Sequence, residues 1–244
     1  MRNIKLTLEY DGTNYHGWQL QPNRVTIQEV LQNALTKLTK TQTQVIGAGR
    51  TDSGVHAAGQ VANFHTASQM PLIAFQKGLN SILPRDIVVI DVEEAPSDFH
   101  ARFSATSRRY RYTILNRAYP SAFLRDSAYF FPRPINLEGA DAICRALIGK
   151  QDFSSFQRTG SDRVNPVCEI YESRCWLEGV LVYFEIEADS FLRGMVRAIV
   201  GTVLKLHDSE NPIHPLHEIL EARDRAAAGP SAPAHGLSLI WVKY

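Results

Sequence analysis

Two neighbouring stretches decide the fold class: NIKLTLEYDG at residues 3–12 and TIQEVLQNALTKL at residues 26–38. In the first, apolar and polar side chains alternate until Asp11-Gly12, the pattern of a half-buried strand that ends in a turn. In the second, apolar side chains recur at intervals of three and four, so they share one face of a helix. Thr26 and Glu29 have capping-box spacing, which predicts that the helix begins directly after Thr26.

The rest of the chain continues this mixture of strands and helices. We predict strands at 43–46, 61–64, 87–92, 110–114, 168–176, 180–188 and 237–244, and helices at 72–83, 137–148, 190–206 and 215–227. Strands often follow one another directly, which favours an α+β fold with a mainly antiparallel sheet over strict βαβ alternation. A strand and then a helix restart near residue 106, so we predict two similar halves, 1–105 and 106–244, that share the sheet.

Composition excludes several classes of protein. The 244 residues include 26 Lys and Arg against 25 Asp and Glu, a net charge of +1, which rules out a uniformly basic nucleic-acid wrapper but allows a local basic patch. The three cysteines form no C-x-x-C pattern, which argues against a disulfide framework or a cysteine zinc site and fits a reducing cytoplasm. No stretch approaches the roughly 18 apolar residues of a membrane span, so we expect a cytoplasmic protein.

The most unusual stretch is GAGRTDSGVHAAGQ, residues 47–60, with four glycines around Arg50 and Asp52. Glycine lets a backbone turn sharply or approach a ligand closely. Arg50 and Asp52 are two residues apart, so in extended backbone their side chains point to the same side. A carboxylate of ordinary acidity is ionised at pH 7 and can act as a nucleophile without a base. The alternative is a tight turn with an Asx-type hydrogen bond from Asp52.

Two further clusters carry arginines. The stretch 99–117 contains Arg102, Arg108, Arg109, Arg111 and Arg117 with two interleaved tyrosines and, from residue 101 onward, no acid. Such a stripe suits phosphate contact and base stacking, although a solvated strand face with its tyrosines in the core is the alternative.

The second cluster lies in SFLRGMVRAIVGTVLKL, residues 190–206, a largely apolar helix in which Arg193 and Arg197 share one side. A partly buried arginine needs an anionic partner, and Asp52 is the candidate. The alternative is that both arginines extend to solvent. Among the histidines, only His214 and His217 have a spacing that weakly suggests a metal site.

Together these segments resemble the TruA family of tRNA pseudouridine synthases. The matching segments are 8–22, 47–64, 83–87, 98–114, 152–156, 189–201 and 236–242. They occur in the family's order over nearly the whole chain, and the box G-R-T-D-x-G-V-H-A followed by F-H-A-R-F-S-A-x-x-R-x-Y-x-Y is highly specific.

The resemblance implies a pseudouridine synthase fold and isomerisation of uridine at positions 38, 39 and 40 of the tRNA anticodon stem-loop, without cofactor or metal. It implies that Asp52 is the catalytic carboxylate, that Arg50 fills the space left by a flipped base or holds a phosphate, that Tyr110 stacks on the uracil, and that Arg197 pairs with Asp52. It also implies a homodimer with tRNA in a basic cleft, where Arg102, Arg108, Arg109 and Arg111 would bind the substrate.

Two positions depart from the family pattern. Cys168 stands where members often carry an arginine, so a tRNA contact is not expected there, and Arg163 is the candidate substitute. Gly194 stands where a larger polar residue is common. Three alternatives remain open from the sequence: a synthase for another RNA site, a catalytically silent RNA-binding protein, and a metal-dependent aspartate hydrolase.

Overall fold

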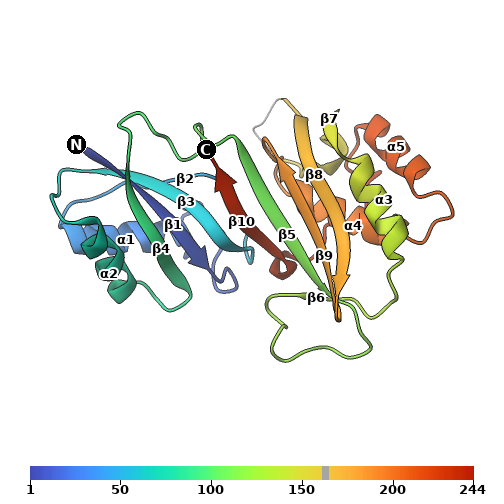
Figure 1. Cartoon of the computed structure of the whole chain (residues 1–244), viewed down its shortest axis with the longest axis horizontal. Coiled ribbons are helices and arrows are strands. Elements are labelled where there is room, and N and C mark those ends of the chain that lie inside the picture. The colour runs from blue at the N-terminus through green and yellow to red at the C-terminus, as the bar shows by residue number, and fades with distance from the viewer. Residues whose placement is uncertain (161–164) are drawn as a thin grey trace. The chain divides into compact units, whose positions relative to one another are not determined.

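The computed structural model describes residues 1–160 and 165–244, so Arg163 lies outside the described residues. The chain divides into two compact units (Figure 1), one of residues 1–106 with 238–244 and the other of residues 107–237. The first unit therefore contains the last seven residues, which the sequence-based division assigned to the second half.

The first unit is an antiparallel sheet with two helices. Its strands lie in the order β4-β1-β3-β10, with β10 parallel to β3 and the short β2 antiparallel to β3. The elements are β1 (Arg2–Tyr10), α1 (Ile27–Thr39), β2 (Ile46–Gly47), β3 (His56–Thr66), α2 (Leu72–Ile82), β4 (Ile87–Ala95) and β10 (Leu237–Lys243).

Helix α1 begins and packs as its sequence predicts. The Thr26 hydroxyl accepts a hydrogen bond from the Glu29 backbone N–H at 3.4 Å, which confirms the predicted start. Ile27, Leu31 and Leu35 are fully buried, as their helical spacing predicts.

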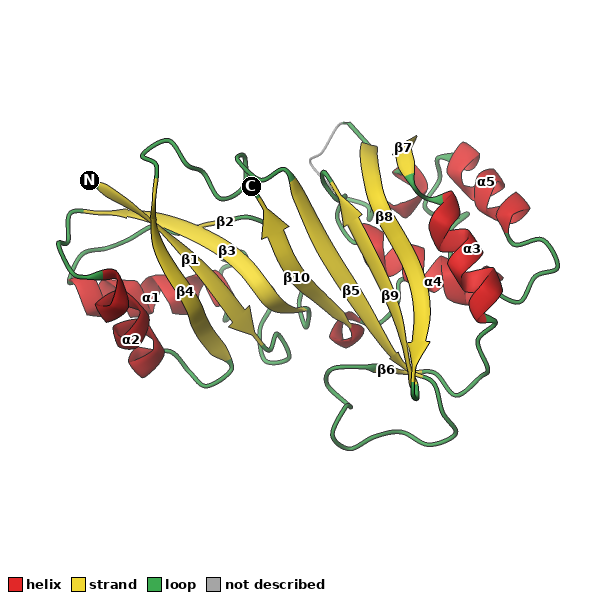
Figure 2. Cartoon of the chain, viewed as in Figure 1, coloured by secondary structure: helices red, strands yellow, loops and turns green. Residues whose placement is uncertain are grey.

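The second unit is also built on an antiparallel sheet, in the order β5-β9-β8-β7, with the short β6 parallel to β5. In Figure 2 its three helices lie together next to β7, β8 and β9. The elements are β5 (Ser107–Leu115), β6 (Tyr129–Phe130), α3 (Leu137–Ala146), β7 (Gly149–Asp152), β8 (Val167–Glu178), β9 (Leu181–Ala188), α4 (Met195–Leu206) and α5 (Ile213–Ala222), with single 3₁₀ turns at Ser154–Phe156 and Ala234–Gly236. The predicted α+β class with a mainly antiparallel sheet is confirmed.

The two faces of β5 and β9 have opposite chemistry. Tyr110, Tyr112, Phe184 and Ile186 share one face and are buried. Arg109 and Arg111 lie on the other face, directly opposite glutamates of β9. Successive side chains of a strand point to opposite faces, so the three arginines of β5 are divided, with Arg108 on one face and Arg109 and Arg111 on the other.

Several predicted elements were wrong in extent. Strand β2 covers Ile46–Gly47 rather than 43–46, and helix α5 ends at Ala222 rather than at residue 227. Helix α4 begins at Met195 rather than at residue 190, because Gly194 has φ +71°, a left-handed backbone conformation that interrupts the helix. Arg193 therefore precedes the helix, so helical spacing does not place it on one side with Arg197. Strand β3 begins at His56 rather than at residue 61, so part of the glycine-rich stretch is strand.

Candidate functional site

The site starts from the loop that joins β2 to β3, residues 48–55. The Val55 backbone N–H donates to the Asp52 carbonyl at 3.1 Å, and Gly54 has φ +76°. A turn of this kind, with glycine at the third position, suits a type II geometry. The tight turn considered as an alternative is thus present in the backbone, and it leaves the Asp52 side chain half-buried at the surface.

Residues 12–18 support this loop from one side. The Trp18 N–H donates to the Thr51 carbonyl at 3.0 Å, and the Gly54 N–H donates to the Tyr15 carbonyl at 3.3 Å. Gly17 has φ +85°, and a Cβ there would lie 2.5 Å from the Thr51 carbonyl oxygen. The Y-D-G-x-x-Y-x-G-W segment therefore fits against the loop so closely that a side chain at Gly17 would displace it.

Burial varies from residue to residue along the loop. Arg50 is exposed, Thr51 is buried and Asp52 is half-buried, and Ser53, the next residue, is exposed. This pattern is not the strict alternation of an extended strand, so the shared side expected for Arg50 and Asp52 stays a prediction. In sequence, the loop places one cation and one carboxylate directly before and after a buried threonine.

The Thr51 hydroxyl is hydrogen-bonded to a side chain of β1. Its Oγ1 lies 2.8 Å from the Tyr10 hydroxyl of β1, and Gln60 of β3 donates to that same hydroxyl at 3.4 Å. Gln60 is fully buried and also binds the backbone of Gly49. Sequence reasoning missed Gln60 and Tyr10; the signal was a glutamine inside an otherwise buried strand.

Tyr110 and Arg197 both belong to the second unit. Tyr110 lies on β5, is 8% exposed, and meets the Phe191 ring edge-on, with centroids 5.1 Å apart. Arg197 is half-buried on α4, and its Nε donates to the Ala232 carbonyl at 2.7 Å. The Ala232 N–H returns a bond to the Arg197 carbonyl at 2.9 Å.

The loop that binds Arg197 is packed closely against α4. A Cβ at Gly201, four residues after Arg197, would lie 1.6 Å from the Pro230 carbonyl oxygen. The hydroxyl of buried Tyr112 donates to the Pro233 carbonyl at 2.7 Å, and burial raises the pKa of this tyrosine. The motif M-V-R-A-I-V-G thus fixes one loop on the arginine side of the helix, and Arg197 is anchored instead of extending freely to solvent.

Two arginines of the basic stripe are engaged by glutamates of the same sheet. Arg109 Nη1 lies 2.9 Å from a Glu185 carboxylate oxygen, and Nη2 lies 2.6 Å from Glu187 and also pairs with Glu172. Arg111 Nη2 lies 2.7 Å from Glu185. Burial alone would raise the pKa of Glu185, but hydrogen bonds from Arg174 and Arg111 lower it below its ordinary value. Neutralised arginines of this kind are poor candidates for binding phosphate.

The other two arginines differ. Arg108 lies on the opposite face, beside Tyr110, and donates to the Asp189 carbonyl at 2.9 Å. Arg102 belongs to the first unit, is exposed, and places its guanidinium 5.6 Å from the centre of the Phe103 ring. The structure therefore does not group the four predicted substrate-binding arginines on one surface.

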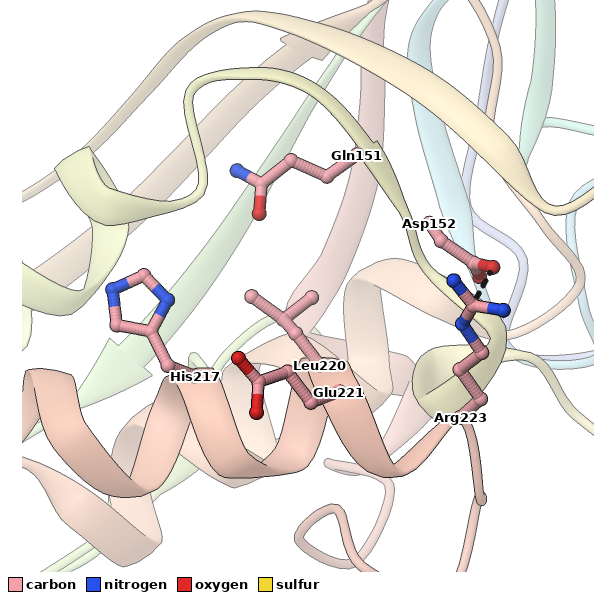
Figure 3. A pocket seen from close by; sticks show the side chains of 6 residues that line it. All are labelled: Gln151, Asp152, His217, Leu220, Glu221 and Arg223. Carbon is pink, nitrogen blue, oxygen red and sulfur yellow. Dashed lines mark ion pairs between the residues drawn. The ribbon is translucent and has the colours of Figure 1, made fainter.

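A separate pocket of about 320 Å³ opens in the second unit (Figure 3) and contains none of the predicted site residues. Asp152 pairs with Arg223 at its edge, Oδ2 to Nε 3.3 Å. Its lining residues are Gln151, Asp152, His217, Leu220, Glu221 and Arg223. Over residues 1–160 and 165–244, no three His, Cys, Asp or Glu side chains are grouped for a metal ion, so His214 and His217 form no such group. In the same ranges, no helix is long and apolar enough to cross a membrane.

Comparison with known proteins identifies the family. The model of the family described as tRNA pseudouridine synthase matches residues 7–104 and 143–244. The chain belongs to this family.

Relatives that match over the full length of the chain carry names of the same family. A protein of Thermoanaerobacter sp. (strain X514) named tRNA pseudouridine synthase A is 43% identical over 244 residues, covering 100% of both chains. Proteins of Acetivibrio thermocellus and Clostridium perfringens, named tRNA pseudouridine synthase A and tRNA pseudouridine synthase A 2, are each 44% identical with the same coverage. A chain of the crystal structure titled "Crystal Structure of a Cbf5-Nop10-Gar1 Complex" is 12% identical with a TM-score of 0.33, over 96% of this chain and 57% of that chain. That likeness is too low to establish a shared fold.

Proposed function

We propose that this chain isomerises uridine to pseudouridine at positions 38, 39 and 40 of the tRNA anticodon stem-loop, with Asp52 as the catalytic carboxylate. The observation that carries the proposal is the 48–55 loop. This loop carries Arg50 and Asp52 two residues apart, and hydrogen bonds from β1, β3 and residues 12–18 hold it. Full-length identity of 43–44% to proteins named tRNA pseudouridine synthase A supports the same substrate class.

The reaction is an internal rearrangement. The glycosidic bond between N1 and C1′ breaks, the uracil turns, and a new bond forms between C5 and C1′. C5 loses the proton that N1 gains, so atoms and electrons balance without a redox partner. Asp52 supplies the negative charge that assists departure of the uracil from C1′ or adds to the nucleotide.

The uridine must leave the helical stack before Asp52 can reach it, which costs a few kcal/mol. Arg50 is exposed beside Asp52 and suits the space vacated by the base or the adjacent phosphate. Tyr110 is the proposed stacking partner of the uracil, and Arg197 is the proposed guanidinium partner of Asp52.

The anticodon stem is A-form RNA, which proteins recognise mainly through shape and backbone contacts. We assign phosphate contacts to Arg102 and Arg108. Arg109 and Arg111 are less suited to that role, since each is paired with carboxylates of its own sheet. The cytoplasm is the proposed location of the reaction.

We also propose that the active form is a homodimer. The loop between β5 and β6 supports a protein contact in this unit. Phe123 is 98% exposed and Tyr119 78% exposed, although arginines fix the loop by bonds to its own backbone. Large exposed aromatics on an ordered loop are typical anchors of protein interfaces. Phe123→Ser should shift sedimentation from dimer to monomer at micromolar concentration, whereas an unchanged dimer would place the interface elsewhere.

The test of the reaction is pseudouridine mapping. Purified protein is incubated with an unmodified tRNA transcript carrying uridine at 38, 39 and 40, with and without a chelator, and pseudouridine is located along the strand. Equal conversion at these positions in both samples is expected. Conversion elsewhere would overturn the assigned positions, and loss of activity with chelator would favour a metal-dependent reaction. Tight tRNA binding without any conversion would favour an RNA-binding protein.

A further inference from the structure

Three side chains beneath the candidate catalytic loop form a buried chain of hydrogen bonds. They are Tyr10 of β1, Thr51 of the loop and Gln60 of β3, which are 2%, 7% and 0% exposed. All three belong to the first unit, together with Arg50 and Asp52. We propose that Gln60, Tyr10 and Thr51 are positioning residues that set the backbone presenting Arg50 and Asp52; this rests on the proposed function.

The side-chain amide of Gln60 binds the loop backbone in the way that a neighbouring strand would. Its Nε2 donates to the Gly49 carbonyl at 2.9 Å, and its Oε1 accepts from the Gly49 N–H at 3.4 Å. One residue earlier, the Ala48 N–H still donates to the Val61 carbonyl at 2.8 Å. The amide thus continues the pairing of β2 with β3 for one residue after the backbones separate.

The direction of one of these hydrogen bonds follows from the donors available. An amide nitrogen can only donate, so Gln60 Nε2 donates to the Tyr10 hydroxyl oxygen at 3.4 Å. The Tyr10 and Thr51 hydroxyls lie 2.8 Å apart, and either of them can be the donor. The amide, the phenol and the threonine hydroxyl are thus joined in one continuous chain of hydrogen bonds.

Along the loop, hydrogen-bonded residues alternate with the two candidate catalytic residues. Gly49 is held by Gln60 and Thr51 by Tyr10, and Arg50 lies between them. Asp52 follows Thr51 directly, and the Ser53 hydroxyl then donates to the Tyr15 carbonyl at 3.2 Å. Each candidate residue is thus flanked by neighbours with fixed positions. A buried polar group is costly unless it is paired, and each of these three buried side chains is hydrogen-bonded.

Small displacements of a reacting group are expensive, because a shift of about 1 Å can cost about 100-fold in rate. Removing one bond of the chain loosens the loop without removing a reacting group. The expected loss is therefore in kcat, with little change in KM.

The test measures kcat and KM for tRNA with Tyr10→Phe and Thr51→Val, each of which deletes one hydroxyl at nearly constant shape. Each should lower kcat about tenfold with KM within about twofold. Thr51→Ser keeps the hydroxyl and should recover most of kcat. The double variant should lose no more than one single variant does, because both remove the same bond.

Asn80→Ala is the matched control for Gln60→Ala. Asn80 binds the Val89 carbonyl at 2.9 Å and accepts from the Val89 N–H at 2.8 Å, in the same unit but away from the loop. Both variants should lower the melting temperature, but only Gln60→Ala should lower kcat. The proposal is overturned if Gln60→Ala and Tyr10→Phe keep wild-type kcat, or if Asn80→Ala lowers kcat equally. An inactive wild-type protein, or an Asp52→Asn variant as active as wild type, would instead overturn the proposed function.

Discussion

The 48–55 loop and the arginine-rich strand β5 are two of the three charged regions singled out by the sequence, and they differ in how their charges are arranged. In the loop, Arg50 and Asp52 project from a fixed backbone whose own polar groups are paired below. On β5, Arg109 and Arg111 are paired with glutamates of β8 and β9. The comparison teaches that arginines close together in sequence can be paired with carboxylates of their own sheet, as Arg109 and Arg111 are.

The largest expected effect comes from Asp52. Asp52→Asn removes the charge while keeping the size, and should lower kcat by at least about 1,000-fold, since the proposed chemistry depends on the carboxylate. The dissociation constant for tRNA should stay within about threefold of wild type, because the side chain contributes little to phosphate binding. Single-turnover kinetics and filter binding measure the two quantities. Comparable losses of binding and rate would indicate a general folding defect.

The next effect concerns Arg197. Arg197→Lys keeps the charge but loses the planar fork and the Nε that donates to Ala232, so kcat should fall about 100-fold. Pseudouridine formation under saturating tRNA measures it, with circular dichroism as the control for folding. A lysine variant of normal rate would show that position 197 needs charge alone.

Arg108 and Arg109 are neighbours on β5, and we expect Arg108 to act in tRNA binding and Arg109 in the stability of the fold. Arg108→Gln should weaken tRNA binding and reduce the slope of log affinity against log salt by about 1. Arg109→Gln should leave that slope unchanged and instead destabilise the fold by about 1–3 kcal/mol, because it removes one of the cations that pair with buried Glu185 and the cation that pairs with Glu187. Salt titrations and urea unfolding test both. If Arg109→Gln changed the salt slope of tRNA affinity and left the free energy of unfolding unchanged, the expected difference between Arg108 and Arg109 would be contradicted.

The smallest effect is a pH dependence. Because the folded-state pKa of Glu185 is below its ordinary value of 4.5, its pairing stabilises the fold above that value. This contribution is lost as the pH falls through the lowered pKa, as protonation removes the charge that Arg111 and Arg174 bind. Between pH 6 and about 3, the melting temperature of wild type should therefore fall more steeply than that of Glu185→Gln. Parallel curves would show that the glutamate contributes no pH-dependent stability.

Local signals predicted much of the fold. The capping box placed the start of α1 correctly, and the predicted start of α3 at residue 137 is also correct, with the Asn136 side chain accepting from the Gly139 N–H. The start of α4 was not predictable from apolar spacing, because the left-handed backbone at Gly194 interrupts a pattern that otherwise continues. The two-residue strands β2 and β6 carry too few residues to show a period.

In the candidate site, too, some features were predictable from the sequence and others were not. The spacing of Arg50 and Asp52 predicts a shared side, and this stays a prediction. Alternation along β5 could have separated Arg108 from Arg109, but the glutamates that bind Arg109 are 63 to 78 positions away in sequence. Gln60 was missed because its partners Tyr10 and Gly49 are found only when the strand register is known.

One measurement tests the central claim most directly. Three tRNA transcripts, each with uridine at only one of positions 38, 39 and 40, are incubated with wild type and with Asp52→Asn, and conversion at every position is quantified. We predict that wild type converts each of the three uridines and that Asp52→Asn converts none within the same time. Equal conversion by the two proteins would contradict the role of Asp52, and conversion only at other positions would contradict the assigned substrate site.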